Sequence, residues 1–384
     1  MASEEFIFRT VADIHSGSGK ISELGALCKR YAIHRPLLVT DQGIIAAGLL
    51  DVCTSSLEAQ QLDVTMFADV VADPPEQTVI DAHELANEAG CDGVIGYGGG
   101  SSMDVAKLIA VLLKNEQILG DMYGVDMIRS SRVPLIQIPT TAGTGSEVTS
   151  VAIVTTGEHT KAGVVSPVLF ADAVVLDPEL TLGLPPHVTA ATGIDAMVHA
   201  IEAFTSKRLK NPLSDMAALR ALQLMAKALP TAVHEGTNLQ ARSDMLLGAM
   251  LAGQAFANAP VGAVHALAYP LGGIYHIPHG LSNSLVLPHV LKFNSAAASG
   301  MYRELANAIL PEEKHAEDAA DRLAEYFLGL AKSCSLQTTL REMDIPEDQI
   351  ETLATESMLQ QRLLINNPRE VLLDDARQIY QAAY

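Results

Sequence analysis

The chain has few basic residues and no long apolar run. Its 384 residues include 25 lysines and arginines against 45 aspartates and glutamates, which gives a formal net charge of −20. A field of that sign repels phosphate backbones and anionic lipid surfaces, so we expect neither a nucleic acid nor a membrane as a partner. No stretch of the sequence approaches the roughly 18 apolar residues of a membrane-spanning helix.

Cysteine is also scarce, and its spacing excludes two kinds of site. The four cysteines are scattered without CxxC spacing: Cys28, Cys53, Cys91 and Cys334. Neither a disulfide framework nor a thiolate zinc site is therefore indicated. The first ten residues are partly charged and lack the apolar core of an export signal. We expect a soluble protein of the reducing cytoplasm.

The first half of the chain has the sequence pattern of an α/β domain. Short β-branched runs at 36–40, 93–96, 133–138 and 173–176 predict strands, and helix-period stretches at 78–89 and 103–113 lie between them. Alternation of this kind is typical of a parallel sheet covered by helices.

The composition and the periodicity of the sequence change after residue 184. Alanine, leucine, methionine and glutamate dominate there, and helical periodicity is found at 214–229, 242–256 and 317–332. Pro185-Pro186 favours a helix start. We predict two domains, an α/β domain over residues 1–184 and an all-helical domain over 185–384, as the length of the chain also favours.

A glycine-rich loop joins a predicted strand to a predicted helix. In Gly96-Tyr-Gly-Gly-Gly-Ser-Ser-Met-Asp104, backbone amides and a helix N-terminus can approach a pyrophosphate. Ser101 is expected to cap the helix, with Asp104 completing a capping-box-like pair. The loop alone is equally compatible with a tight turn that binds no ligand.

Two further loops follow strands of the same predicted sheet. Asp41 ends the first clear strand, where a carboxylate can accept hydrogen bonds from ribose hydroxyls and repel a 2′-phosphate, which favours NAD over NADP. The same aspartate can also be an ordinary turn residue. The segment 139–146 offers small residues and hydroxyls. Ligands of open parallel sheets gather at the carboxyl ends of the strands, so the three loops are expected to converge.

The helical half holds two groups of metal-ligating residues. Asp195 and His199 are four apart on a predicted helix and share one face. The segment His265–Gly280 contains three histidines. One carboxylate and several imidazoles suit iron(II) or zinc(II). The alternative is that these histidines cap buried turns and hold no ion.

Taken together, the motifs resemble the iron-containing (group III) alcohol dehydrogenase family. They are Gly98–Lys107, Pro139–Glu147, Gly193–His199, His265–Gly280 and Asn367–Arg369. The resemblance covers the chain from end to end. It implies a Rossmann-like N-terminal domain that binds the nucleotide, an all-helical C-terminal domain that binds the metal, and self-association into homodimers or larger oligomers.

The resemblance also implies roles for individual residues. The metal ligands are Asp195, His199, His265 and His279. The implied nucleotide contacts are Asp41, Gly99, Gly100, Ser101, Asp104, Thr140, Thr141, Thr144, Thr149 and Lys161. Phe256 belongs to the implied substrate wall.

The chain departs from the family pattern at two places. Tyr269 stands where many members have the second histidine of His-x-x-x-His, which is commonly given a proton-transfer role. We therefore assign the proton relay to His276 or Tyr269, or to the ribose and solvent. Asp73-Pro-Pro75 stands where many members have Asn-Pro-Thr, so Asp73 is a weak candidate for a cofactor contact.

These observations predict a metal-dependent oxidoreductase. It transfers a hydride between NAD and a small primary alcohol, diol or hydroxyacid, reversibly, with iron(II), Fe²⁺, or zinc(II), Zn²⁺, as the metal. Three alternatives stay open. They are a hydroxyacid–oxoacid transhydrogenase with a retained nucleotide, a lyase similar to dehydroquinate synthase, and a module that binds nucleotide or stores metal without catalysis.

Overall fold

The computed structural model describes residues 5–114, 116–157, 160–310 and 318–384. The chain divides into two compact units. One comprises Arg9–Gly183, and the other comprises Leu184–Tyr384 with the described residues up to Phe8. The first unit contains a parallel sheet and the second is helical, which confirms the predicted fold class.

A six-stranded parallel sheet forms the centre of the α/β unit. Its strands lie in the order β1-β9-β6-β4-β2-β3. Their bounds are β1 (Asp13–Ser16), β2 (Pro36–Val39), β3 (Thr65–Phe67), β4 (Gly93–Gly98), β6 (Leu135–Pro139) and β9 (Ala173–Leu176). Because β4 pairs in parallel with both β2 and β6, the carboxyl ends of these three strands meet at one edge of the sheet.

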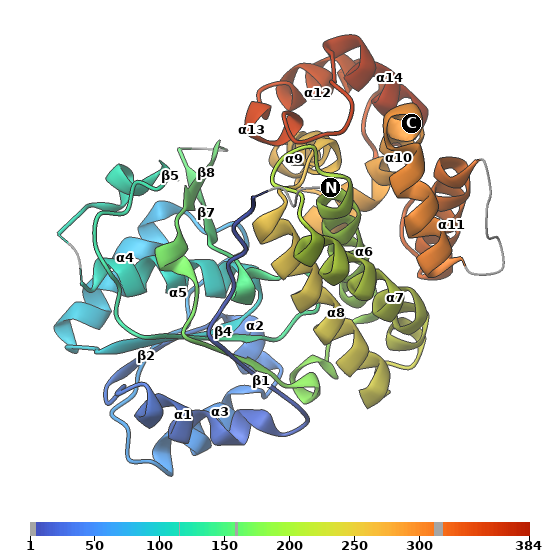
Figure 1. Cartoon of the computed structure of the whole chain (residues 1–384). Helices are drawn as coiled ribbons and strands as arrows, with labels where there is room; N and C mark the ends of the chain where they lie inside the picture. Colours follow the sequence, from blue (N-terminus) through green and yellow to red (C-terminus); the bar gives the residue numbers. More distant parts are fainter. Residues whose placement is uncertain (1–4, 115, 158–159, 311–317) are drawn as a thin grey trace. The chain divides into compact units, whose positions relative to one another are not determined.

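Helices cover both faces of this sheet (Figure 1). α1 (Leu24–Arg30) and α3 (Leu50–Glu58) lie on one face, and α4 (Glu76–Glu88) and α5 (Gly100–Leu112) lie on the other. Leu24 and Leu57 belong to the same buried cluster as Ile95 and Ile138 of the sheet. Strands covered on both faces are continuously apolar, which explains why the runs in β2, β4, β6 and β9 were recognisable in the sequence.

A second, three-stranded sheet was not predicted. It has the order β5-β8-β7, with β5 (Gly124–Val125), β7 (Val151–Thr156) and β8 (Thr160–Val165). β7 and β8 are antiparallel. Ala152 and Val154 point into the protein, whereas Val151 and Ile153 are only half-buried. β7 starts with the short apolar run Val151–Val154, but only every second residue of this run is buried.

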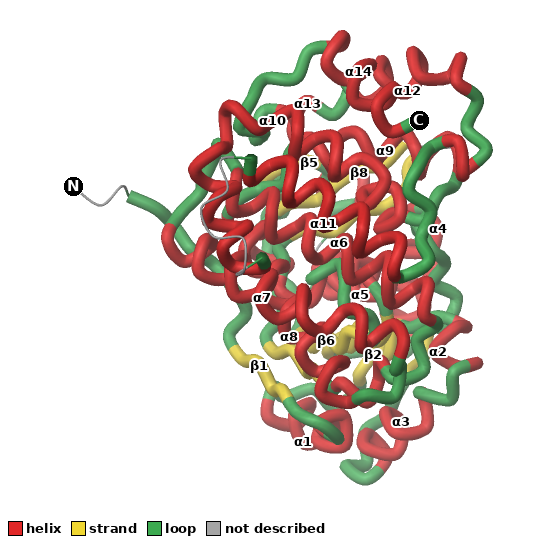
Figure 2. The backbone as a smooth tube through the Cα atoms, turned by 90° about the vertical axis from the view of Figure 1, so that its right-hand side faces the viewer, coloured by secondary structure: helices red, strands yellow, loops and turns green. Residues whose placement is uncertain are grey.

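The second unit consists of helices, and none of its described residues forms a strand (Figure 2). They are α6 (Pro186–Thr205), α7 (Pro212–His234), α8 (Leu239–Asn258), α9 (Ala263–Tyr275), α10 (His279–Ile309), α11 (Ala319–Ser333), α12 (Ile350–Ser357), α13 (Gln361–Leu364) and α14 (Leu373–Ala383). α6 begins at Pro186, as predicted, because proline suits the first turn of a helix. Most of α6 is buried, which makes it the central helix of this unit.

No single helix in the described part of the chain is long and apolar enough to span a membrane. Only α8 and α9 taken together are long and apolar enough, and they are bent by 107° at the break between them.

Candidate active site

Four potential metal ligands from three helices converge in the helical unit. Asp195 and His199 lie one turn apart on α6, His265 lies in the first turn of α9, and His279 is the first residue of α10. One donor atom of each lies within 4.8 Å of the other three. Asp195 Oδ1 is 3.9 Å from His199 Nε2 and 3.7 Å from the Nε2 atoms of His265 and His279.

These separations fit one tetrahedrally coordinated ion. Metal–ligand bonds of about 2.1 Å place neighbouring ligand atoms about 3.4 Å apart, a few tenths of an ångström less than the distances from Asp195 Oδ1. One carboxylate and three imidazoles form a donor set that suits iron(II) or zinc(II). The three Nε2 atoms gather around one carboxylate oxygen, an arrangement that capping of separate turns would not require.

The electrostatics of the group keep its carboxylate ionised. Asp195, His199 and His265 are buried, while the side chain of His279 is 46% exposed. Burial acts to raise the pKa of Asp195, but the three histidines and a hydrogen bond from Asn283 outweigh burial and lower it. Asp195 is therefore available as a charged ligand, and the His279 side of the group is open to small molecules.

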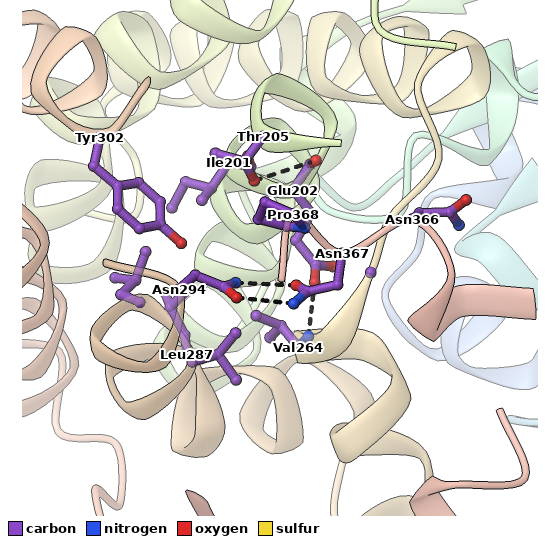
Figure 3. Close-up of a pocket in the computed structure, with 13 residues that line it drawn as sticks. Ile201, Glu202, Thr205, Val264, Leu287, Asn294, Tyr302, Asn366, Asn367 and Pro368 are labelled. Carbon is purple, nitrogen blue, oxygen red and sulfur yellow. Dashed lines mark hydrogen bonds between the residues drawn. The ribbon is translucent and has the colours of Figure 1, made fainter. Parts of the chain in front are cut away.

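Glu202 orients His265 from behind and was not predicted. It lies seven residues after Asp195 on α6, on the same face. Its Oε2 is 2.6 Å from His265 Nδ1. Its Oε1 accepts a hydrogen bond of 2.7 Å from the Val264 amide, and Figure 3 shows Glu202 beside Val264. A carboxylate on one ring nitrogen fixes the tautomer that leaves the other nitrogen as a metal ligand. The i, i+4, i+7 spacing of 195, 199 and 202 was the signal that could have identified it.

The charge of Glu202 also affects the protonation of His265. Burial acts to lower the pKa of His265, but the hydrogen bond and charge of Glu202, together with Asp195, outweigh it and raise the pKa. Arg362 acts in the opposite direction. The guanidinium of Arg362 is thus electrostatically coupled to the metal group.

Asn283 is a further polar residue at the centre that sequence reasoning missed. It lies one turn after His279 on α10, and its Nδ2 donates a hydrogen bond of 2.6 Å to Asp195 Oδ1. The same nitrogen is 3.3 Å from the Nε2 atoms of His265 and His279. Asn283 Oδ1 is buried and has no hydrogen-bond partner among the described residues. A buried polar atom without a partner carries a desolvation cost, so Asn283 is held in this position by the hydrogen bond that its Nδ2 donates to Asp195.

Two neighbouring residues shape the metal group. A side chain at Gly280 would place its Cβ 2.3 Å from the Ala191 carbonyl oxygen, so only glycine lets the first turn of α10 approach α6 this closely. Phe256 of α8 stacks on His199, with ring centroids 4.4 Å apart. The structure thus places the implied substrate-wall residue directly against a metal-ligand candidate.

Tyr269, one of the two candidates for proton transfer, has a ring contact with the metal group. It lies one turn after His265 on α9, and its ring centroid is 6.1 Å from that of His279. Its hydroxyl accepts a hydrogen bond of 3.3 Å from Arg362 Nη2. His276 is exposed and ends α9 with a left-handed backbone, φ 54°.

In the α/β unit, the loops after β2, β4 and β6 meet as predicted. Asp41 caps α2 (Gln42–Ala46) by accepting a hydrogen bond from the Ile44 amide, and its Oδ2 accepts another of 3.1 Å from Ser102 Oγ in the glycine-rich segment. The Thr140 amide donates to the Gly98 carbonyl oxygen at 3.0 Å. The Asp41 carboxylate therefore lies beside the glycine-rich loop.

The glycine positions of this loop lie against the third loop. A Cβ at Gly99 would be 3.8 Å from Thr141 Oγ1, and one at Gly100 would be 2.9 Å from Thr144 Cγ2. The predicted capping box is wrong, because α5 begins at Gly100 and its N-cap is Gly99, with no side-chain cap. Ser101 lies inside the first turn instead, so its hydroxyl is not needed to cap the helix.

Two predicted nucleotide contacts belong to a buried network around Lys107. The Lys107 ammonium donates to Ser146 Oγ at 2.8 Å and to Thr149 Oγ1 at 3.1 Å, and it forms an ion pair with Asp104. Asp104 also accepts hydrogen bonds from Ser146 Oγ and the Ile153 amide. Asp104 and Thr149 thus hold the loop after β6 in place. Lys107 lay inside the quoted motif but was not singled out.

The two remaining candidates contact each other. Lys161 on β8 forms an ion pair with Asp73, whose carbonyl oxygen accepts a hydrogen bond from Thr155 Oγ1. Lys161 and Asp73 therefore form one charged pair, although they lie 88 positions apart in the sequence.

Comparison with known proteins agrees with this site. Residues 12–178 match the iron-containing alcohol dehydrogenase family, and residues 189–384 match the C-terminal part of the Fe-containing alcohol dehydrogenase family. Long-chain-alcohol dehydrogenase 1 of Geobacillus thermodenitrificans is 40% identical over 375 residues, 96% of this chain and 94% of the relative. NAD-dependent methanol dehydrogenase of Bacillus methanolicus is 33% identical over 96% of this chain and 97% of the relative.

A solved structure shows the same likeness in three dimensions. The crystal structure of 1,3-propanediol oxidoreductase has a TM-score of 0.95 and is 32% identical, and the match covers 99% of this chain and all of the other. The family resemblance stated from the sequence is therefore confirmed. The chain belongs to the iron-containing alcohol dehydrogenase family and is an oxidoreductase.

Proposed function

We propose that this protein holds one divalent ion, iron(II) or zinc(II), between Asp195, His199, His265 and His279, and transfers a hydride reversibly between NAD and a small primary alcohol, diol or hydroxyacid. The observation that carries the proposal is the convergence of four donor atoms within 4.8 Å of one another. When bound, such an ion supplies the Lewis acidity that lowers the pKa of an alcohol and polarises an aldehyde carbonyl.

The residues of the chain prepare the site for this chemistry. Asp195 remains charged and Glu202 holds the ring of His265 in place, so that the donor atoms are oriented before substrate arrives. Phe256 provides an apolar surface beside His199, suited to the carbon chain of an alcohol. The half-exposed His279 leaves an approach for substrate.

NAD as the nucleotide is supported by Asp41 and by a relative. The carboxylate lies beside the glycine-rich loop, where it can accept hydrogen bonds from a ribose and repel a 2′-phosphate. The helix α5 begins at Gly100 in this loop, and the amides at the N-terminus of a helix favour a phosphate. The methanol dehydrogenase relative is named as NAD-dependent.

Proton transfer is assigned to the Tyr269 hydroxyl or to His276, with ribose and solvent as the other route. The ring of Tyr269 contacts the metal group at His279, with ring centroids 6.1 Å apart. If Tyr269→Phe and His276→Ala both leave the turnover and the pH–rate profile unchanged, a protein-side relay is wrong.

Two other activities predict different kinetics. A transhydrogenase would keep its nucleotide bound and pass hydride to an oxoacid, so linear and stoichiometric turnover of free NAD would exclude it. A lyase similar to dehydroquinate synthase would form product without net NADH.

The direct test is an anaerobic preparation reloaded with iron(II) or zinc(II) and assayed for NADH formation with a panel of primary alcohols and hydroxyacids. We expect the loaded protein to be active and to bind one metal ion per chain. His199→Ala should lose both the activity and the bound metal. His234→Ala, at the exposed end of α7, is the matched control and should keep both. Bound metal and NADH without any redox activity would contradict the proposal.

We also propose a cytoplasmic location and assembly into a homo-oligomer. The four free, buried cysteines support a reducing compartment. Light scattering of the purified protein tests the assembly, and fractionation of the native cells tests the location.

A further inference from the structure

Arg362 is a charged residue beside the metal group that the proposed chemistry does not use. It is exposed, and its guanidinium carbon is 5.9 Å from the centroid of the Tyr269 ring. Its Nη2 donates to the Tyr269 hydroxyl at 3.3 Å. Tyr269 in turn faces His279, so the guanidinium lies one side chain away from a metal-ligand candidate.

The backbone under Arg362 is firmly held. Leu363 and Leu364 are buried, and the Arg362 carbonyl oxygen accepts a hydrogen bond of 3.0 Å from Asn366 Nδ2. The same amide also donates to the Val261 carbonyl oxygen at 2.9 Å, which ties the segment to the start of α9. The guanidinium is therefore carried by a fixed segment, as a recognition residue requires.

The charge of Arg362 is not neutralised by a neighbour. No carboxylate in the described part of the chain forms an ion pair with it, whereas the exposed Arg369 and the half-buried Arg377 each pair with an aspartate. Among the described residues, the carboxylates that contact the metal group are Asp195 and Glu202, and a divalent ion would balance both charges. The positive charge of Arg362 then remains in excess, in a chain that is otherwise strongly acidic.

Arg362 and Tyr269 together present hydrogen-bond donors that can bind an anion. Because Arg362 donates to the tyrosine oxygen, the O–H of Tyr269 keeps its own proton to donate, and most of the five guanidinium N–H groups stay available. A phenol O–H beside a guanidinium matches the oxygens of a carboxylate or sulfonate. A histidine at position 269 would provide no such hydroxyl.

We propose that Arg362 and Tyr269 bind an anionic group at the far end of the substrate, so that the preferred alcohols are small ω-hydroxycarboxylates or their sulfonate analogues rather than neutral alcohols. This inference rests on the proposed function and narrows its substrate class.

The test compares 4-hydroxybutanoate with 1-butanol, which have four-carbon chains and differ in charge. The wild-type holoenzyme should show a kcat/KM at least about tenfold higher for the hydroxyacid, the size expected for one charged hydrogen bond. Arg362→Gln should bring the ratio of kcat/KM for the hydroxyacid to kcat/KM for 1-butanol close to one, and Arg362→Lys should restore part of that ratio. The preference should weaken as salt is added, because the guanidinium is exposed.

A control and a binding measurement separate recognition from folding and from turnover. Arg341→Gln removes another exposed arginine that lies over a tyrosine, 4.6 Å from the Tyr384 ring centroid, and should change nothing. In calorimetry, the holoenzyme should bind butyrate about tenfold more tightly than butyramide, and only Arg362→Gln should abolish the difference.

The outcomes distinguish the two levels of the proposal. Oxidation of 1-butanol at equal or greater efficiency than the hydroxyacid, with no preference for butyrate, would overturn the inference and leave the dehydrogenase intact. A loss in Arg362→Gln that is equal for both substrates would show a structural role and would also overturn it. Butyrate binding that depends on Arg362 without oxidation of any alcohol would uphold the anion site and refute the proposed function.

Discussion

Replacing Glu202 by glutamine tests whether the metal group depends on the carboxylate behind it. Glutamine has the same shape but only one acceptor oxygen. In the protein both carboxylate oxygens are used, one by His265 Nδ1 at 2.6 Å and one by the Val264 amide at 2.7 Å. In Glu202→Gln one of these two N–H groups must face the amide NH₂, and His265 loses the charge that fixes its tautomer.

The size of the effect follows from the lost contact. A hydrogen bond to a charged group contributes about 1.5–3 kcal/mol. Mutation of a residue that orients a metal ligand typically lowers metal affinity by about 10- to 100-fold, or about 1.4–2.8 kcal/mol. The two ranges overlap, so we expect zinc(II) affinity to fall by about 10- to 100-fold.

The assay is competition for zinc(II) with a chromogenic chelator at fixed pH. Glu147→Gln is the matched control, because Glu147 is equally buried but belongs to the α/β unit. Circular dichroism should show that both variants are folded. An unchanged zinc affinity in folded Glu202→Gln would refute the argument that this carboxylate orients His265.

Three other perturbations have defined outcomes. Asp41→Asn keeps an acceptor for the α2 cap but removes the charge, so kcat/KM for NADP relative to NAD should rise at least about tenfold; an unchanged ratio would exclude Asp41 as the selector. Gly280→Ala puts a methyl group against the Ala191 carbonyl and should lower the free energy of unfolding in urea by about 1–3 kcal/mol. Burial raises the pKa of Glu147 to about 7, so its contribution to stability is fully present below its ordinary pKa of 4.5 and falls by about 3 kcal/mol as pH rises through about 7. Urea unfolding of Glu147→Gln at about pH 5 and about pH 8 should lack this loss, and an equal pH slope in both proteins would contradict it.

The parts of the fold that could be predicted are those whose signal is local. β2, β4, β6 and β9 are apolar on both faces, and each appeared as a short continuous run. β1, β3 and β8 were missed, since these strands contain polar residues and have no such run. β7 was missed although it starts with the apolar run Val151–Val154, because half of that run is only partly buried. The start of α6 was predicted because a proline marks it directly.

In the site, too, features within one helix could be predicted and contacts between distant segments could not. The spacing of Asp195 and His199 is visible along one helix, whereas the contact between Arg362 and Tyr269 joins residues 93 positions apart. No pattern in the sequence announces that contact, because it arises only when α13 packs near α9. The predicted cap at Ser101 failed because α5 already begins at Gly100, with Gly99 as its N-cap.

The metal-ligand candidates come from α6, α9 and α10, three helices that make up much of the core of the helical unit. An ion held there is a reversible cross-link, and a ligand that binds only the native state stabilises it by RT ln(1 + [L]/Kd). The free energy of unfolding of this protein then depends on the free metal concentration, and it rises by about 1.4 kcal/mol for each tenfold excess of metal over Kd. Resistance to heat rises with it. Cells short of the metal would lose the protein to unfolding and proteolysis as well as losing its activity.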